Sequence, residues 1–285
     1  MRVNNDWKDF EVIATSEGEK LERWGNFYLL RPDPQVIWKS DKNLSKYALL
    51  NAKYARSSTG GGEWEIKKKM PEEWTISWRE LKFKVKLMGF KHTGVFPEQA
   101  YNWDKMISLI KQANRPINVL NLFAYTGGAT LACASAGASV THIDASKGMT
   151  ERARENLNIS GLGNAKVRTI VEDCEKFVER EIRRGNKYDA IIMDPPSYGR
   201  GPKGEIWKIE EKIFDFIKLT SQILSDNPLF VLVNSYTTGL QPTVIKNVMN
   251  IAYGDKFTTY DAYELGLPTA EQIVLPCGAS CMANN

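Results

Sequence analysis

The segment INVLNLFAYTGGAT, residues 117–130, decides the fold of this chain. Its first half is an apolar run that predicts a strand buried on both faces, and its second half places Gly127 and Gly128 ahead of a helix of small residues. A buried strand that passes through a glycine turn into a helix is typical of a parallel sheet with helices on both faces. The segment therefore predicts the α/β fold class.

The same alternation of strands and helices continues toward the C-terminus. A helix is expected from about residue 146 to about residue 160, closed by Gly161. Residues 258–265 and 271–276, divided by a glycine and a proline, are expected to form a closing antiparallel hairpin. Further strands are expected at residues 139–144, 166–173, 188–194 and 229–235. These elements predict a doubly wound sheet of seven strands with an antiparallel hairpin at its edge.

The first third of the chain differs in composition from the rest. Residues 1–93 carry 18 Lys and Arg against 13 Asp and Glu, a net +5, whereas residues 94–285 carry 20 against 21, a net −1. Residues 1–93 also hold six of the eight tryptophans. Strands are expected at WGNFYLLRP, residues 24–32, and PQVIWKS, residues 34–40. We therefore expect a β-rich N-terminal domain, residues 1–93, and a second domain, residues 94–285.

A lysine stripe is expected in LKFKVKL, residues 81–87. Because side chains alternate along a strand, Lys82, Lys84 and Lys86 share one face and apolar side chains share the other. Lysines with interleaved aromatic residues suit an RNA surface, where phosphates give affinity and bases stack. The alternative is an ordinary half-exposed strand, with the tryptophans in the core.

The composition disfavours membrane, exported and zinc proteins. The sequence has no run of about 18 apolar residues, and residues 1–14 lack the apolar core of a secretory signal. Its four cysteines form no C-x-x-C pair, and it has two histidines, so a tetrahedral zinc site lacks ligands. We expect a cytoplasmic protein with reduced thiols, no metal and no contact with a membrane.

Polar residues follow four consecutive strands of the predicted sheet. They are the loop from Phe123 to Gly128, then Asp144, Asp173 and Asp194. In doubly wound sheets, ligands bind outside the carboxyl ends of the strands, so we expect these residues to meet at one edge. Each acid also has a structural interpretation: Asp144 could lie at a turn, and Asp173 could cap the helix that follows it.

The ligand is expected to be a nucleoside. Adjacent glycines let backbone approach a ligand closely, but the loop lacks the G-x-G-x-x-G pattern of a pyrophosphate cradle, which disfavours an NAD-dependent oxidoreductase. Asp144 follows Gly127 by 17 residues, close to the spacing of an acid that binds ribose. S-adenosylmethionine is a nucleoside without a pyrophosphate and fits this pattern. We expect Asp144 to contact the ribose and the Asp173–Cys174 segment to contact the adenine.

Five motifs together resemble class I S-adenosylmethionine-dependent methyltransferases, specifically the family of large-subunit ribosomal RNA methyltransferases that includes cytosine-C5 enzymes and stand-alone bacterial members. They are LNLFAYTGGAT (120–130), VTHIDASKGM (140–149), AREN (153–156), VEDC (171–174) and DPPSYGRGPKGE (194–205). FKHTGVFPEQAYNW, residues 90–103, looks like the segment before that family's cofactor fold. The resemblance covers roughly residues 88–280 and implies cofactor contacts from Phe96, Gln99, Asn121, Phe123, Ala124, Tyr125, Thr126, Gly127, Gly128, Asp144, Ala145, Ser146, Asp173, Cys174 and Asp194.

Methylation of cytosine C5 is the second choice within this family. That reaction needs a cysteine thiolate that adds to C6, and in the cytosine-C5 branch this cysteine follows the strand after the DPP motif. Residues 234–237 read NSYT, so Tyr236 stands at that position. Cys133 is expected to pack within a helix, whereas a role for Cys277 or Cys281 stays open.

The DPPSY motif looks like the D/N-P-P-aromatic motif of enzymes that methylate nitrogen, with Ser197 inserted. In such a site a carboxylate and a proline carbonyl accept hydrogen bonds from a substrate N–H, while an aromatic ring stacks on the base. We assign the catalytic roles to Asp194, Pro195, Pro196 and Tyr198.

The loop GRGPKGE, residues 199–205, is expected to be a lid in which Arg200 and Lys203 meet phosphates; the alternative is a solvated turn. The predicted substrate contacts are Arg200, Lys203, Tyr236, Lys82, Lys84 and Lys86. The sequence thus predicts an S-adenosylmethionine-dependent methyltransferase of an RNA base, with ribosomal RNA favoured. The alternatives are a methyltransferase for a small molecule or protein, and a non-catalytic RNA-binding protein on the same fold.

Overall fold

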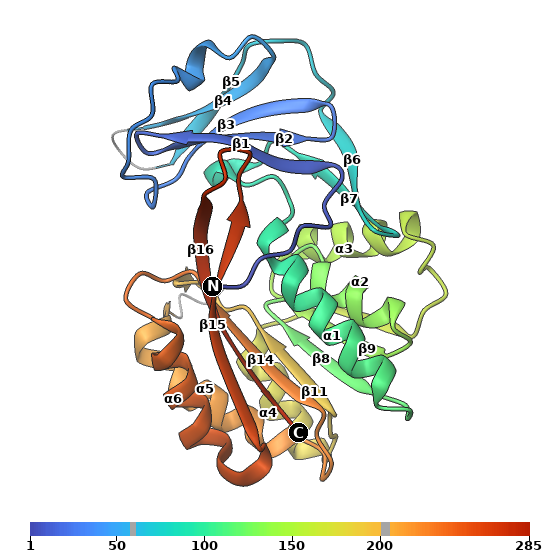
Figure 1. Ribbon diagram of the computed structural model, residues 1–285. Coiled ribbons are helices and arrows are strands. Elements are labelled where there is room, and N and C mark those ends of the chain that lie inside the picture. The colour runs from blue at the N-terminus through green and yellow to red at the C-terminus, as the bar shows by residue number, and fades with distance from the viewer. Residues whose placement is uncertain (58–60, 201–205) are drawn as a thin grey trace. The chain divides into compact units, whose positions relative to one another are not determined.

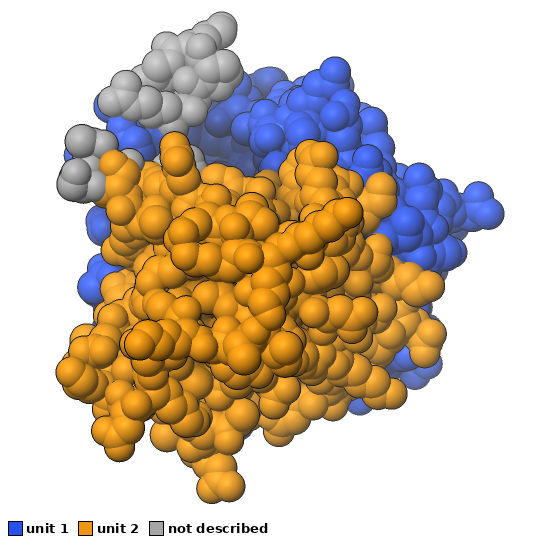
Figure 2. Space-filling model, turned by 90° about the horizontal axis from the view of Figure 1, so that it is seen from above, with its two compact units in different colours: residues 1–2, 101–265, 278–285 blue, residues 3–100, 266–277 orange. Residues whose placement is uncertain are grey.

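The computed structural model describes residues 1–57, 61–200 and 206–285 (Figure 1). The chain forms two compact units (Figure 2). Unit 1 consists of residues 1–2, 101–265 and 278–285, and unit 2 consists of residues 3–100 and 266–277. The division into domains at residues 93 and 94 stays a prediction; the units differ from it in residues 1–2, which belong to unit 1, and in residues 94–100 and 266–277, which belong to unit 2.

A seven-stranded sheet forms the centre of unit 1, in the order β10-β9-β8-β11-β14-β16-β15. Strands β10, β9, β8, β11 and β14 run parallel, and β16 runs antiparallel to β14. The strands are β8 (Asn118–Leu122), β9 (Ser139–Asp144), β10 (Val167–Val171), β11 (Ala190–Met193), β14 (Phe230–Ser235), β15 (Thr259–Pro268) and β16 (Val274–Asn284). The doubly wound seven-stranded sheet with an antiparallel edge is therefore confirmed.

Helices cover both faces of this sheet (Figure 1). On one face, Leu120, Ile191 and Val231 join the apolar side chains of α4, α5 and α6 in one core. Helices α1, α2 and α3 lie on the other face, where Thr130 of α2 accepts a hydrogen bond from Asn121 of β8. The helices are α1 (Ala100–Gln112), α2 (Gly128–Ser135), α3 (Lys147–Ile159), α4 (Cys174–Arg184), α5 (Ile209–Thr220) and α6 (Pro242–Tyr253), with short 3-10 turns η4 (Ser221–Ile223) and η5 (Gly254–Lys256). None of the described helices is long and apolar enough to span a membrane.

Local sequence sets the ends of α3 and α4. The Ser146 hydroxyl accepts the Met149 N–H at 3.4 Å at the start of α3, and Gly161 follows its end in the left-handed conformation, with φ of 74°. The Asp173 carboxylate accepts the Lys176 N–H at 3.0 Å and caps α4. Both helices therefore start at the edge of the sheet where the strands end.

Unit 2 contains a five-stranded sheet, in the order β1-β2-β3-β4-β5, and a separate hairpin of β6 and β7. Its elements are β1 (Phe10–Ser16), β2 (Glu19–Trp24), β3 (Phe27–Pro32), β4 (Leu50–Arg56), β5 (Gly62–Ile66), β6 (Glu73–Trp78) and β7 (Leu81–Lys86), with η1 (Leu44–Lys46), η2 (Gly89–Lys91) and η3 (Pro97–Gln99). The expected lysine alternation in β7 is present, because Leu81, Phe83 and Val85 are buried between the lysines. The N-terminal region is thus β-rich, as predicted.

The tryptophans of unit 2 contribute to its own packing. Trp24 and Trp78 are fully buried. The indole N–H groups of all six, at residues 7, 24, 38, 64, 74 and 78, donate to acceptors within the unit. Trp24 and Trp78 therefore belong to the core, whereas the other four are partly exposed and their contact with RNA stays a prediction.

The expected strand at residues 34–40 is wrong. The segment has no strand pairing, and Ile37 is 90% exposed. The carbonyls of Val36 and Trp38 instead accept the N–H groups of Gly18 and Glu17 in the turn between β1 and β2. Its backbone groups thus find partners without joining the sheet.

Candidate active site

The loop after β8 has an uncommon backbone conformation. Phe123, Tyr125 and Gly127 all lie in the left-handed region, with φ of 55°, 51° and 89°. Residues such as phenylalanine and tyrosine adopt this conformation only where surrounding contacts hold them, often at functional sites. Here the Tyr125 N–H donates to Asp144 Oδ2 at 2.8 Å. The end of β9 therefore helps to hold the loop in its strained shape.

The two glycines of the loop face neighbouring helices. A Cβ on Gly127 would lie 3.0 Å from the Cβ of Ala153 in α3, and a Cβ on Gly128 would lie 2.5 Å from Cζ2 of Trp103 in α1. Only glycine lets α2 begin this close to α1 and α3. A contact of the glycines with a ligand would therefore have to use their backbone atoms.

Asp144 lies between the loop and α3. Its Oδ2 accepts the Tyr125 N–H and its Oδ1 accepts the Ser146 N–H, each at 2.8 Å. Burial raises the pKa of this carboxyl, and the two hydrogen bonds, which act in the opposite direction, do not offset it. A carboxylate oxygen can accept more than one hydrogen bond, so both oxygens can also accept ribose hydroxyls. Asp144 therefore fits the nucleoside part of S-adenosylmethionine.

Asp173 and Cys174 begin α4 beside the same loop. Asp173 acts as the helix cap, as its structural interpretation predicts, and the contact with adenine stays a prediction. The Cys174 Sγ accepts the Phe123 N–H at 3.3 Å. Burial raises the pKa of the Cys174 thiol, so it supports the loop rather than acting as a nucleophile.

The Asp194-Pro195-Pro196 turn follows β11, the neighbour of β8 in the sheet. The Asp194 N–H lies 3.4 Å from the Leu122 carbonyl and continues the parallel pairing of these strands. Asp194 is half-buried, Pro195 is buried and Pro196 is exposed. The Pro196 carbonyl accepts the Trp207 Nε1–H at 2.7 Å. The turn is therefore fixed next to the start of the loop at Phe123.

The inserted Ser197 ties this turn to the end of β14. Its hydroxyl lies 2.6 Å from the Thr237 hydroxyl, and its carbonyl accepts the Ile209 N–H. Tyr198, 50% exposed, then begins β12 (Tyr198–Arg200), which pairs with β13 (Ile206–Lys208). Lys203 lies outside the described residues, so the expected lid is described only at its base.

Tyr236 follows β14 and packs against the backbone of β16. A Cβ on Gly278 would lie 2.9 Å from two carbons of the Tyr236 ring. Asn234, two residues earlier, belongs to a buried polar network: the Asn102 amide donates to Asn234 Oδ1 at 3.1 Å and to Ser280 Oγ at 3.2 Å. The Tyr236 ring is therefore held in a defined position at the end of β14.

The structure provides no activated thiol at this edge. Cys133 and Cys281 are fully buried in unit 1, and burial raises the pKa of both, that of Cys281 to about 12. Cys277 belongs to unit 2, where burial raises its pKa as well. Since only a thiolate attacks C6 of cytosine, the burial of these thiols is unfavourable for C5 methylation.

The candidate active site is the edge of the sheet at the carboxyl ends of β8, β9, β11 and β14. Hydrogen bonds join Tyr125 to Asp144, Phe123 to Cys174 and the Asp194 turn to β8. The Asn121 amide instead donates to Thr130 in the core, and the Thr126 carbonyl accepts the Asn156 amide at 3.0 Å. The predicted contacts that lie in unit 2 are Phe96, Gln99, Lys82, Lys84 and Lys86, and they stay predictions.

Sequence reasoning missed Trp207 and Asn156. Asn156 lies in the AREN motif and supports the loop through Thr126. Trp207 follows the predicted lid, where an isolated aromatic residue gives no periodic signal.

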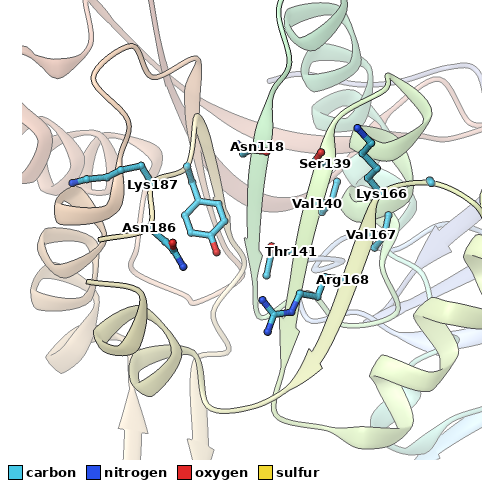
Figure 3. A pocket seen from close by; sticks show the side chains of 11 residues that line it. Asn118, Ser139, Val140, Thr141, Lys166, Val167, Arg168, Asn186 and Lys187 are labelled. Carbon is cyan, nitrogen blue, oxygen red and sulfur yellow. The ribbon is translucent and has the colours of Figure 1, made fainter. Parts of the chain in front are cut away.

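A pocket of about 450 Å³ lies at the opposite, amino ends of the strands (Figure 3). Asn118, Ser139 and Val167, the first residues of β8, β9 and β10, line it together with Lys166 and Arg168. It contains none of the predicted site residues, and ligands of doubly wound sheets bind at the other end. In the described parts of the chain, no three or more His, Cys, Asp or Glu side chains are grouped so as to hold a metal ion.

Comparison with known proteins shows which family the chain resembles. The sequence profile of the family described as S-adenosylmethionine-dependent methyltransferase matches residues 31–216. The crystal structure of an S-adenosylmethionine-dependent methyltransferase from Agrobacterium tumefaciens superposes with a TM-score of 0.92 and 32% sequence identity, covering 99% of this chain and 92% of that chain.

Two relatives are named as ribosomal RNA methyltransferases. Ribosomal RNA large subunit methyltransferase K/L of Shewanella frigidimarina is 33% identical over 156 residues, which are 54% of this chain and 21% of that protein. Ribosomal RNA large subunit methyltransferase K of Neisseria meningitidis is 24% identical over 269 residues, which are 89% of this chain and 72% of that protein. The matched region thus spans about a fifth of the first relative's length and most of the second.

Proposed function

Because the chain belongs to the family of S-adenosylmethionine-dependent methyltransferases, we propose that it methylates a base in RNA, with ribosomal RNA as the favoured substrate. A nitrogen is the favoured acceptor atom. A cytoplasmic location is part of the same proposal, since RNA and the cofactor meet there.

Some residues at the sheet edge would bind the cofactor, and others would align the methyl acceptor with it. When bound, S-adenosylmethionine supplies a methyl group on a positively charged sulfur. An acceptor in line with the carbon–sulfur bond takes the methyl group, and the sulfur leaves as a neutral thioether. Asp144 would accept the ribose hydroxyls, the backbone of residues 123–128 would line the nucleoside, and the start of α4 would contact the adenine. Alignment of the reacting atoms can supply about 7–11 kcal/mol of the barrier, so the reaction needs no catalytic histidine.

One observation carries the proposal: the Asp194 turn lies beside the loop, because the Asp194 N–H continues the pairing of β11 with Leu122 of β8. At this position the Asp194 carboxylate and the Pro195 carbonyl would accept hydrogen bonds from a substrate N–H and orient its lone pair. The half-exposed Tyr198 or Tyr236 would stack on the base. The raised pKa values of all four thiols favour nitrogen over cytosine C5.

Two findings support RNA as the substrate class. Relatives from Shewanella frigidimarina and Neisseria meningitidis are named as ribosomal RNA methyltransferases. In addition, residues 1–93 carry 18 Lys and Arg against 13 Asp and Glu, and Lys82 in β7 is exposed. Exposed cations of this kind bind phosphates without sequence preference.

The test is transfer of a labelled methyl group to ribosomal RNA from a strain that lacks this protein, followed by mass spectrometry of the nucleosides. We expect label in one nucleoside, and none in RNA from the parent strain, because there the position is already methylated. Equal labelling of both RNAs would contradict the proposal, and activity without RNA would favour a small-molecule or protein substrate. A covalent adduct with RNA that contains 5-fluorocytosine would exclude nitrogen as the acceptor.

A further inference from the structure

Trp207 joins two parts of the candidate active site. It lies in β13, opposite Gly199 of β12. Its Nε1–H donates to the Pro196 carbonyl at 2.7 Å, and its ring centroid lies 5.3 Å from that of Phe123. Pro196 belongs to the predicted substrate turn, and Phe123 belongs to the predicted cofactor loop. One side chain therefore contacts both.

The core of unit 1 holds Trp207 in place. Phe216 of α5 is buried, and its ring centroid lies 5.7 Å from that of Trp207 and 5.6 Å from that of Phe123, both edge-on. The Phe123 N–H is in turn bound to the buried Cys174 Sγ at 3.3 Å. Because packed aromatic rings prefer such tilted arrangements, the three rings form a defined connection between the hairpin and the loop.

We propose that Trp207 is a positioning residue, which keeps the Asp194-Pro195-Pro196 turn and the β12–β13 hairpin aligned with the loop at residues 123–128. Trp207 acts through Pro196 and Phe123. Cofactor that binds to the loop then restrains strands β12 and β13 next to the Asp194-Pro195-Pro196 turn. This inference rests on the proposed function, and it adds a coupling between cofactor and substrate regions that the function does not require.

The test compares Trp207→Phe with Trp64→Phe. The first variant keeps a ring beside Phe123 but loses the donor to Pro196. Trp64 is a matched control in unit 2, because its Nε1–H also donates to a carbonyl, that of Met88 at 2.7 Å, and its ring lies 5.4 Å from that of Tyr54. Calorimetry measures the binding of S-adenosylhomocysteine, and hydrogen–deuterium exchange follows residues 197–200 and 206–208 with and without it.

In the wild type and in Trp64→Phe, we expect S-adenosylhomocysteine to slow exchange in the hairpin by about fivefold or more, the lower range of coupling between sites. In Trp207→Phe we expect this protection to disappear while the Kd stays within about threefold of the wild-type value. The turnover number should fall by about 10–100-fold with little change in KM for the cofactor, since a misplacement of 1 Å can cost this much.

Each result decides the inference. Protection that persists in Trp207→Phe, or that disappears equally in Trp64→Phe, overturns it. If the wild type binds S-adenosylhomocysteine without any change in hairpin exchange, the inference fails and the proposed function stands; if the wild type does not bind it, both fail. Should Trp207→Phe not fold, Phe123→Leu breaks the same connection from the loop side, and persistent protection there also overturns the inference.

Discussion

Glu22 in unit 2 and Asp144 in unit 1 are two shielded carboxylates with opposite electrostatics. Arg31 donates two hydrogen bonds to the fully buried Glu22, at 2.6 and 2.8 Å, and Lys20 lies 3.5 Å away. Burial raises the pKa of Glu22, but these cations outweigh it and the pKa is lowered. Asp144 has backbone N–H partners, and there the effect of burial prevails and raises the pKa.

The opposite pKa shifts of Glu22 and Asp144 distinguish a structural carboxylate from one that we propose binds a ligand. A buried charge with a cationic partner in the same unit has its charge compensated, and removal of that partner alone destabilises the fold. A half-buried carboxylate that receives N–H donors but whose pKa is still raised can take a further partner, and such groups concentrate at functional sites. The buried charge of Glu22 in unit 2 is therefore paired within the structure, whereas we propose that Asp144 at the edge of unit 1 takes a ligand as a further partner.

Removal of Arg31 should change the free energy of unfolding more than any other substitution proposed for this comparison. It tests whether the buried charge of Glu22 depends on its cationic partner. Arg31→Met leaves Glu22 charged and buried beside Lys20, which should lower the free energy of unfolding by about 3–5 kcal/mol. Urea unfolding followed by tryptophan fluorescence measures it, because six of the eight tryptophans lie in unit 2. The double variant Glu22→Leu with Arg31→Met should recover much of the loss.

The exposed pair of Lys39 and Glu17 is the control, with side chains that are 76% and 61% exposed. Lys39→Met should cost less than about 1 kcal/mol. Equal losses for Arg31→Met and Lys39→Met would show that the buried charge of Glu22 does not need Arg31 for compensation.

A pair of substitutions at the sheet edge tests the functional half. Asp144→Ala should weaken cofactor binding by at least about 100-fold, because each hydrogen bond to a charged group contributes about 1.5–3 kcal/mol. Asp194→Ala should leave the cofactor Kd within about threefold but lower the turnover number by about 100-fold, since it acts on alignment of the acceptor. Calorimetry and single-turnover methyl transfer separate the two effects. The assigned roles are untenable if both variants lose cofactor affinity equally.

Acid should expose a further contrast, between the two histidines. Burial lowers the pKa of His142 in unit 1 to about 4, and its Nδ1 lies 2.9 Å from the Thr130 hydroxyl. The unfolded chain, with a histidine pKa near 6.5, then binds the proton more readily, so stability is lost as pH falls from about 6.5 toward about 4. Between pH 7 and pH 5, His142→Gln should lose about 2 kcal/mol less than the wild type in urea unfolding.

His92 in unit 2 is the comparison for that measurement. Burial, together with Arg31, Lys91 and Lys20, lowers its pKa to about 4 as well. Because His92 is partly exposed, His92→Gln should change the pH dependence less than His142→Gln does. The reverse order would mean that burial is not the main cause of the His142 shift.

The sequence predicted the sheet and its edge better than the contacts within that edge. Strand periodicity placed Asp144 and Asp194 at strand ends correctly, since burial on both faces leaves a strong apolar signal. The same pattern could not show that Gly128 faces Trp103, or that Trp207 reaches both Phe123 and Pro196, because these contacts join distant segments. The strand expected at residues 34–40 was wrong for a related reason. Carbonyls of this segment accept N–H groups from the turn between β1 and β2 instead of pairing in a sheet.

The smallest expected effect concerns the lysines of β7, and it decides whether unit 2 takes any part in function. Lys86 lies 3.6 Å from Glu73, and the apolar face between the lysines is buried. If these lysines meet RNA phosphates, replacing Lys82, Lys84 and Lys86 by Gln should reduce the slope of log K against log salt by about 1–2, at about 0.7 per phosphate of a single strand. The turnover number at saturating RNA should stay unchanged, because no reacting group is touched.

The matched control replaces Lys39, Lys42 and Lys46 by Gln. These three substitutions remove the same charge from the same unit. An equal change of slope in both triple variants would reduce the role of β7 to overall charge, whereas an unchanged slope in both would leave unit 2 a purely structural region.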